Sequence, residues 1–121
     1  MQDFKKLNVW AKAHKLTLSV YEVTSRFPRE ELYGLTQQIR RAASSIPTNI
    51  AEGCGRGTPG DFARFLQIVA GSAAEVEYQF LLARDLNYLP EDRYAALDAD
   101  VCEVKRMLAA LLARVQESRD S

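Results

Sequence analysis

The longest regular pattern in the sequence is a series of apolar residues, near its end, that alternate between spacings of three and four. These residues are Tyr94, Leu97, Val101, Val104, Leu108, Leu111 and Val115. Because an α-helix has about 3.6 residues per turn, they lie on one face of a helix. A seam of this kind packs against a neighbouring helix at a shallow crossing angle. We therefore expect a helix at about residues 91–117 that runs alongside other helices.

Three earlier segments repeat this rhythm, and we expect helices at about residues 5–26, 31–52 and 59–86. The apolar face of the first is Val9, Ala13, Leu16, Val20, Val23 and Phe27. The face of the second is Leu32, Leu35, Ile39, Ala42 and Ile46. The face of the third is Phe62, Phe65, Leu66, Val69, Ala73, Val76 and Phe80. Four such helices joined by short loops predict a single domain over residues 1–121, an all-α, antiparallel up-down-up-down four-helix bundle.

Proline, glycine, threonine and asparagine mark the expected helix ends. Pro28 ends the first helix, because the residue before a proline is pushed out of the α region. Gly53 is expected to end the second helix. Thr58 predicts an N-cap for the third, with Pro59 at its first helical position. Asn87 predicts a left-handed cap where that helix stops.

Pro47 lies inside the second expected helix. It has no backbone N–H, so the carbonyl of Ala43 loses its usual donor. We expect a kink at Pro47, with the freed carbonyl bonded by Ser44 or Ser45.

Some helices are apolar on more than one side. The additional residues are Ile68, Leu82 and Leu86 in the third helix and Met107, Ala110 and Leu112 in the fourth. Because a monomeric bundle needs one apolar stripe per helix, the surplus favours burial between subunits. The alternative is that these residues widen the core stripe. Small residues at 70–74 would let another helix approach closely.

The charge is divided between the two halves of the chain, although the total is zero. Residues 1–57 contain nine Lys/Arg and five Asp/Glu, and residues 58–121 contain seven and eleven, so the halves carry +4 and −4. Such a division is typical of a basic binding face or of complementary surfaces between subunits. A neutral total is weak support for nucleic acid as the main partner.

Most catalytic and metal chemistries lack the residues that they need. His14 is the only histidine, which excludes two-histidine and three-histidine metal sites. Cys54 and Cys102 stand far apart and predict two free thiols. The G-x-G-x-x-G match at residues 55–60 follows a helix, whereas a dinucleotide fingerprint follows a strand. We therefore expect no enzymatic activity, no metal and no cofactor.

Targeting signals are also missing from the sequence. Residues 1–6 lack the apolar region of a signal peptide, and uncharged runs such as residues 66–74 are too short to span a bilayer. These features predict a cytoplasmic protein with no membrane partner.

Residues 37–53 concentrate hydrogen-bonding groups among apolar anchors around Pro47. In one interpretation these groups bridge helices or subunits, with Glu52 pairing with Arg40 or Arg41. In the other, a basic face binds phosphates. That face would consist of Lys5, Lys6, Lys12, Lys15, Arg40, Arg41 and Arg56. Glu52 and the neutral total weaken its field, which favours the structural interpretation.

The same stretch resembles a known family, the four-helix bundle proteins encoded by intervening sequences in some bacterial 23S rRNA genes. The matching pieces are residues 7–13, 27–28 with Glu31, 33–35, 38–43, 45–53, 55–56 and 71–77. They cover about residues 4–90 in order and at the family's spacing. The family is similar in turn to accessory proteins of diversity-generating retroelements, pentameric bundles that bind a reverse transcriptase and nucleic acid.

The resemblance implies a ring, expected to be a homopentamer, with no enzymatic activity and with RNA or an RNA-associated protein as a possible partner. It also implies a set of structural or interface residues: Gln38, Arg41, Ser45, Pro47, Asn49, Glu52, Gly53, Gly71 and Glu75. Our first hypothesis is a homo-oligomeric scaffold. The second is an RNA- or DNA-binding module, and an enzyme with an unrecognised site is the third.

Overall fold

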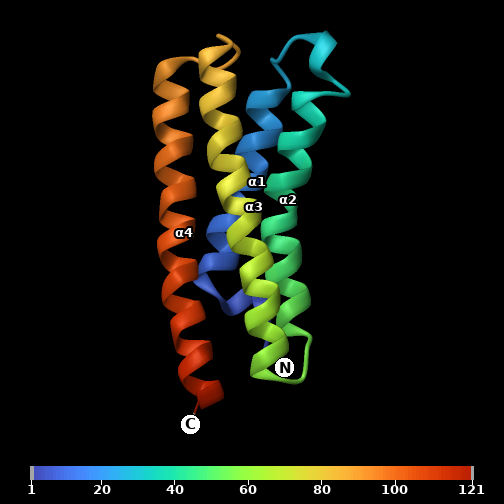
Figure 1. Ribbon diagram of the computed structural model, residues 1–121. Coiled ribbons are helices and arrows are strands. Elements are labelled where there is room, and N and C mark those ends of the chain that lie inside the picture. The colour runs from blue at the N-terminus through green and yellow to red at the C-terminus, as the bar shows by residue number, and fades with distance from the viewer. Residues whose placement is uncertain (1, 121) are drawn as a thin grey trace.

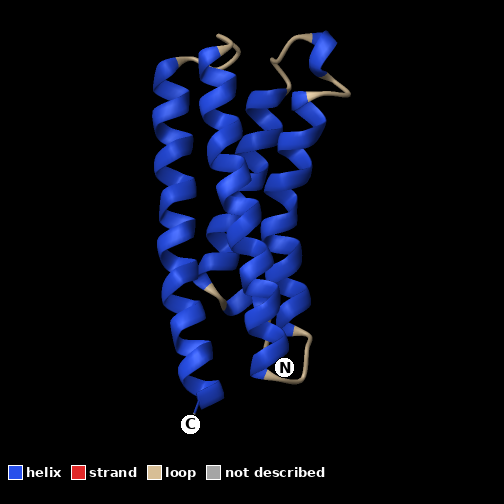
Figure 2. Cartoon of the chain, viewed as in Figure 1, coloured by secondary structure: helices blue, strands red, loops and turns tan. Residues whose placement is uncertain are grey.

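Four α-helices form an antiparallel bundle in the computed structural model, which describes the backbone of residues 2–120 and the side chains of residues 2–119 (Figure 1). The elements are η1 (Phe4–Lys6), α1 (Asn8–Thr24), η2 (Arg29–Glu31), α2 (Leu35–Cys54), α3 (Pro59–Asp85) and α4 (Glu91–Asp120). Figure 2 shows short loops at the two ends and no strand in the part of the chain described. The predicted all-α fold class is confirmed.

Each helix packs against two neighbours. α2 and α4 flank α3, and they also flank α1, so α1 and α3 occupy diagonal positions. In the described residues no helix combines the length and the apolar character that crossing a membrane requires.

The predicted apolar faces form the core with two exceptions. All the residues predicted for α1 and α3 are buried, as are those of α4 apart from the partly buried Tyr94. Leu32 was placed wrongly, because its side chain is 49% exposed and it precedes α2. The core therefore follows the helical period wherever the chain is helical.

The position at which α2 begins explains why Leu32 is exposed. Residues 29–31 form a 3₁₀ turn, and the helix begins at Leu35, where the backbone N–H donates to Glu31 Oε1 at 3.1 Å. A Cβ on Gly34 would lie 2.7 Å from that oxygen, so glycine leaves room for the cap. Likewise α1 begins at Asn8, later than predicted, because Leu7 is extended after the turn η1.

Pro47 is accommodated within a continuous helix from Leu35 to Cys54. The freed carbonyl of Ala43 accepts a hydrogen bond from the Thr17 hydroxyl of α1 at 3.2 Å, which the hydroxyl shares with Ala13 O at 2.9 Å. The predicted serine donors were wrong: Ser44 donates to Arg41 O and Ser45 pairs with Ser72. The donor that replaces the missing N–H of Pro47 therefore comes from α1, a neighbouring helix.

Gly53 does not end α2 as predicted, because the helix continues to Cys54. A Cβ on Gly53 would lie 2.9 Å from both Phe62 Cδ1 and Phe65 Cβ of α3. Such distances are too short for a real Cβ, so glycine is required for the close approach of α2 and α3 at this end.

The predicted caps of α3 are confirmed. Thr58 Oγ1 accepts from the Asp61 N–H at 3.1 Å, and Pro59 is the first helical residue. Beyond the other end, Asn87 has φ 64° and Tyr88 N–H donates to Ala83 O at 2.9 Å. This is the left-handed turn that asparagine favours at a helix C-terminus.

Candidate assembly surface

Two distant motif stretches meet in a groove between α2 and α3. The groove has a volume of about 270 Å³ and is lined by Gln38, Arg41, Ala42, Ser45, Ser72 and Glu75. Since the two helices are antiparallel, residues 38–45 of one lie against residues 72–75 of the other. We call this feature the α2–α3 groove.

The groove presents opposite charges on its two walls. Glu75 Oε2 accepts from the amide of Gln79 at 3.3 Å, and Gln79 is only 5% exposed. The buried amide thus fixes the carboxylate on the α3 side, while Gln79 Oε1 has no hydrogen-bond partner among the described residues. On the α2 side, the exposed Arg41 guanidinium makes no ion pair within the described part of the chain. A hydrogen bond between Ser45 Oγ and Ser72 Oγ joins the walls.

The remaining motif residues have separate positions. Asn49 donates to Ser45 O at 2.8 Å, and Pro47 is buried. Glu52 pairs with Arg56 at 3.5 Å, so within this chain it does not meet Arg40 or Arg41. Gly71 faces open space, because a Cβ there would have no neighbour within 4 Å. Only part of the motif set therefore belongs to the groove.

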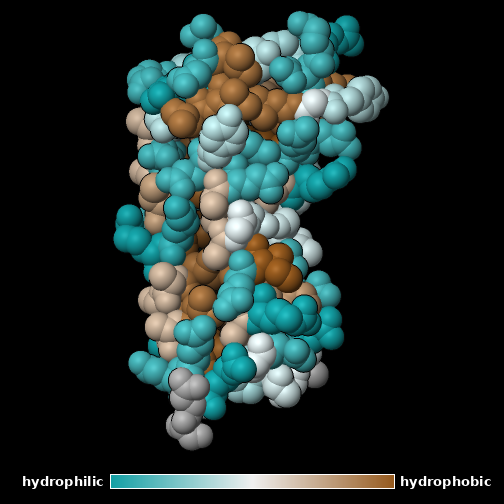
Figure 3. Space-filling view, in the orientation of Figure 1, coloured by the Kyte–Doolittle hydropathy of each residue, from teal (hydrophilic) through white to brown (hydrophobic). Residues whose placement is uncertain are grey.

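Large apolar side chains are exposed in two parts of the chain, one on α3 and one on α1 with the loop before α2. The α3 patch consists of Ile68, Tyr78 and Leu86, which are 44%, 60% and 43% exposed. The α1–α2 patch consists of Leu18, Tyr21, Leu32 and Tyr33, which are 57%, 47%, 49% and 86% exposed. Figure 3 shows apolar surface over the upper part of one face and a smaller apolar group midway down.

Some of the surplus apolar residues widen the core, and others stay exposed as burial between subunits would require. Leu82, Met107 and Leu112 are partly buried against the core, as expected if they widen it. Ile68 and Leu86 remain exposed, as do Ala70, Gly71 and Ala74 of the small-residue run. Within the described chain no helix covers these positions of α3.

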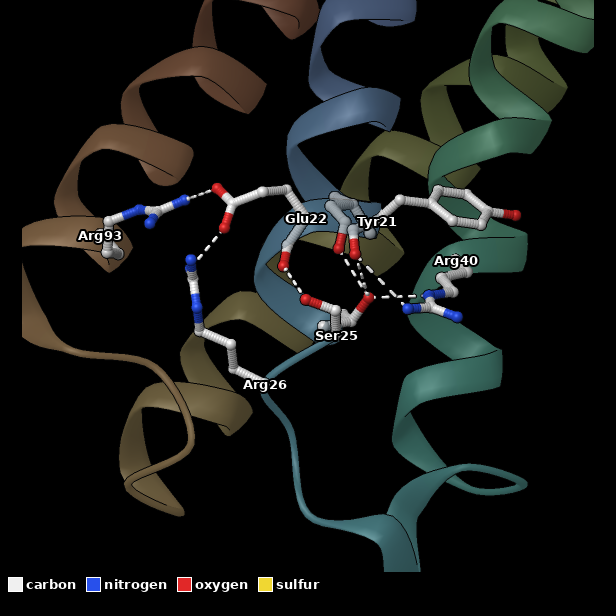
Figure 4. Close-up of polar contacts among 8 residues, drawn as sticks. Tyr21, Glu22, Ser25, Arg26, Arg40 and Arg93 are labelled. Carbon is white, nitrogen blue, oxygen red and sulfur yellow. Dashed lines mark hydrogen bonds and ion pairs between the residues drawn. The ribbon is translucent and has the colours of Figure 1, made fainter.

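Polar contacts hold the C-terminal end of α1 from both sides (Figure 4). On one side Glu22 forms ion pairs with Arg26 and with Arg93 of α4, and the hydrogen bond from Arg93 is the main cause that lowers the pKa of Glu22. On the other side Arg40 Nε donates to Thr24 Oγ1 at 2.7 Å, with its guanidinium 4.8 Å from the Tyr21 ring centre. Arg40 thus supports the fold.

The predicted basic residues do not share one environment. Lys12 pairs with Asp100 at 3.1 Å and Glu103 at 3.5 Å, and the hydrogen bond to Asp100 is the main cause that raises the pKa of Lys12. Arg40 is bound to α1, and Arg56 pairs with Glu52. The residues left without an ion pair in the described chain are Lys5, Lys6, Lys15 and Arg41.

A mixed cluster on α3 and α4 was not predicted. Single ligand atoms of Glu77, Asp98 and Cys102 lie within 4.8 Å of one another. Lys105 Nζ donates to Glu77 at 2.6 Å, however, and burial is the main cause that raises the pKa of the Cys102 thiol. A protonated thiol and a neutralised carboxylate are poor metal ligands, so this arrangement is best described as an interhelical ion pair. No short sequence motif could have revealed it, because its members are on two helices.

The fold and groove define a small all-α four-helix bundle with polar and apolar surfaces. The chain belongs to the 23S rRNA-intervening sequence protein family, whose sequence model matches residues 5–110. A solved protein with unknown function from the S23 ribosomal protein family of Bacteroides thetaiotaomicron VPI-5482 has the same fold. It is 24% identical, with a TM-score of 0.81 over 87% of this chain and 95% of that one. No curated protein matches the chain.

Proposed function

We propose that the chain is a non-enzymatic scaffold that assembles with copies of itself into a ring. The observation that carries this proposal is the pair of exposed apolar patches on a bundle whose core is already closed. Large apolar side chains that stay exposed beside a closed core are candidates for burial against another subunit.

The type of assembly follows from the difference between the patches. The α3 patch lies on α3, whereas the α1–α2 patch lies on α1 and the loop before α2, so a contact of one patch with the other would join copies head to tail. Head-to-tail contacts close into rings when the rotation permits. The pentameric size rests on the resemblance of the motif stretches to the family.

The α2–α3 groove supports the same proposal. A bound neighbour that placed a carboxylate near Arg41 and a donor near Glu75 would satisfy both walls. Charged groups of this kind fix register and select partners more than they add affinity.

The test is the mass of the particle in solution. Light scattering at tens of micromolar should give an oligomer for the wild type and a smaller species for Ile68→Lys, which puts a charge in the α3 patch. Gln67→Lys, an exposed neighbour on α3, should keep the wild-type mass. A wild-type monomer under these conditions would refute the proposal.

A second candidate function is binding of RNA, favoured by the unpaired Lys5, Lys6, Lys15 and Arg41 and by the rRNA in the family's description. Affinity for a structured RNA should fall steeply with salt, and the double variant Lys5→Glu/Lys6→Glu should reduce that slope. Arg106→Glu, an exposed arginine of α4, is the control. Absence of a complex at low salt would rule out this candidate.

A further inference from the structure

A pocket opens at the end of the bundle that holds the loop between α2 and α3. Its volume is about 390 Å³, which lies within the range of about 300–1,000 Å³ typical of small-molecule sites. Its walls come from the N-terminal segment, the end of α2, the loop, the start of α3 and the last turns of α4.

The pocket is held open by defined contacts. Gln2 N–H donates to Cys54 O at 3.1 Å, which fixes the N-terminal segment beside the end of α2. Gly53 lets α3 approach closely on the other side, where Phe62 lies against it. The Thr58 cap fixes the loop where it enters α3.

The lining combines an apolar floor with cationic groups. The apolar side chains of the lining are Leu7, Phe62, Leu111 and Val115, which we call the floor, and the lining also includes Cys54, whose thiol is free. Among the described residues of the lining, Arg56 and Arg114 are charged and none is a carboxylate. Arg56 is partly neutralised by Glu52 at 3.5 Å, whereas Arg114 makes no ion pair in the described part of the chain.

A third arginine adds to this charge. A Cβ built on Gly60 would lie 3.7–3.9 Å from the guanidinium of Arg119, so that group covers the first turn of α3. The nearest acidic residue of this turn, Asp61, faces Arg64 at 3.9 Å. Arg119 thus brings a third guanidinium to the end of the bundle that holds Arg56 and Arg114.

We propose that this pocket binds a small organic anion whose apolar or aromatic body lies on the floor and whose single carboxylate or phosphate group contacts Arg114. An inorganic anion would leave the apolar floor unused, and a neutral molecule would leave the guanidinium unpaired. A ligand with an apolar body and an anionic group would contact both kinds of lining residue, the apolar side chains and the guanidinium of Arg114. This site does not depend on the proposed assembly, because all its walls belong to one chain.

The test is an amide-resolved NMR titration of the whole chain with four probes. Octanoate has an apolar body with a carboxylate, and phenyl phosphate has an aromatic body with a phosphate. Inorganic phosphate has the charge without an apolar body, and octanamide has the apolar body without a charge. At least one of the first two should saturate and shift the amides of Gly57 and Thr58. Inorganic phosphate and octanamide should bind at least about tenfold more weakly, since each lacks one of the two interactions.

Charge variants of α4 separate a specific site from general attraction. Arg114→Gln should raise the dissociation constant about tenfold, as expected for loss of a charged hydrogen bond, and Arg114→Glu should raise it further. Arg106→Gln and Arg106→Glu make the same charge changes on the same helix. They should change the dissociation constant by no more than about twofold. Both positions are exposed, so folding should be unaffected, which the NMR spectra check directly.

Three results would overturn the proposal. One is a set of shifts that never saturates or spreads over all cationic surfaces. Another is equal affinity for inorganic phosphate, which indicates simple ion binding. The third is an equal effect of the Arg114 and Arg106 variants. The mass of the assembled particle should be the same for Arg114→Gln and the wild type. A failure of the anion-site proposal can therefore be distinguished from a failure of the assembly proposal.

Discussion

Thr17 supplies the hydrogen bond that Pro47 removes from α2. Its hydroxyl donates to Ala43 O, the carbonyl that would otherwise accept from residue 47. A buried carbonyl without a donor is costly. The hydroxyl of Thr17 therefore offsets the hydrogen bond that the proline removes from this helix.

Replacing Thr17 by Val keeps the side-chain shape and removes the donor. We expect Thr17→Val to lower the free energy of unfolding by about 1–3 kcal/mol, the cost of an unsatisfied buried polar group. Thr48→Val, an exposed position of α2, should change it by less than about 0.5 kcal/mol. Urea unfolding followed by circular dichroism measures both.

A double-mutant cycle tests the mechanism. Pro47→Ala restores an N–H for Ala43 O, so Thr17→Val should cost less in that background than in the wild type. If Thr17→Val lowered the free energy of unfolding equally in both backgrounds, the hydrogen bond of Thr17 would not compensate for Pro47.

Glycines 53 and 71 form a matched pair for a second prediction. Gly53→Ala should lower the free energy of unfolding by about 1–3 kcal/mol, because the new methyl group would overlap Phe62 and Phe65. Gly71→Ala meets nothing in the chain and should raise it by about 0.5–1 kcal/mol through helix propensity. Unfolding is compared at one chain concentration.

The outcome at Gly71 also bears on assembly. If Gly71→Ala lowered the mass of the assembled particle while leaving the helical content unchanged, Gly71 would lie in a contact between subunits. Equal stability of Gly53→Ala and the wild type would contradict the close approach of α2 and α3.

At the scale of elements, the end of α1 depends on contacts from α2 and α4. Arg40 reaches it from one side and Arg93 from the other (Figure 4). Because these contacts join three helices, they connect elements that are distant in the sequence.

Acid should remove the contribution of Glu22 to this arrangement. Its pKa in the folded chain is lowered from the ordinary 4.5, chiefly by Arg93, so its charged form is favoured by folding. The resulting stability is present above the unfolded pKa and disappears as the pH falls through the folded pKa. Glu22→Gln should therefore melt at a lower temperature than the wild type at pH 7, and the difference should vanish in acid.

Glu30→Gln is the control for this experiment, since Glu30 is exposed and makes no ion pair in the described chain. Its melting temperature should follow the wild type at every pH. A difference between Glu22→Gln and the wild type that persisted in acid would indicate a cause other than charge.

The buried face of each helix was predictable from the sequence because the helical period is a local property. The start of α2 was not, because Leu32 fits the 3-4 rhythm although residues 29–34 form turns stabilised by the Glu31 cap. The groove partners Ser45 and Ser72 were in predicted helices, but their contact is tertiary. The same holds for Lys12, whose acidic partner Asp100 is 88 residues away.

At the scale of the whole molecule, head-to-tail assembly makes a prediction about mixtures. Ile68→Lys retains an intact α1–α2 patch, and Tyr33→Asp retains an intact α3 patch. Each variant alone should be monomeric, since a contact between copies needs both patches. Mixed together they should form a one-to-one complex that grows no further.

Native mass spectrometry of the mixture distinguishes the alternatives. A heterodimer supports two different faces, as a ring requires. Homodimers of either variant would instead indicate that one patch contacts itself.

The division of charge between the hairpins matters during synthesis. The first hairpin, α1 with α2, is made first and exposes apolar residues until α3 and α4 follow. Because residues 1–57 carry +4, two unfinished chains repel each other, whereas the −4 of residues 58–121 attracts the completing half to its own chain. Ion pairs such as Lys12–Asp100 then form between the halves. The charge that cancels in the finished protein therefore favours pairing of unlike halves over pairing of like ones.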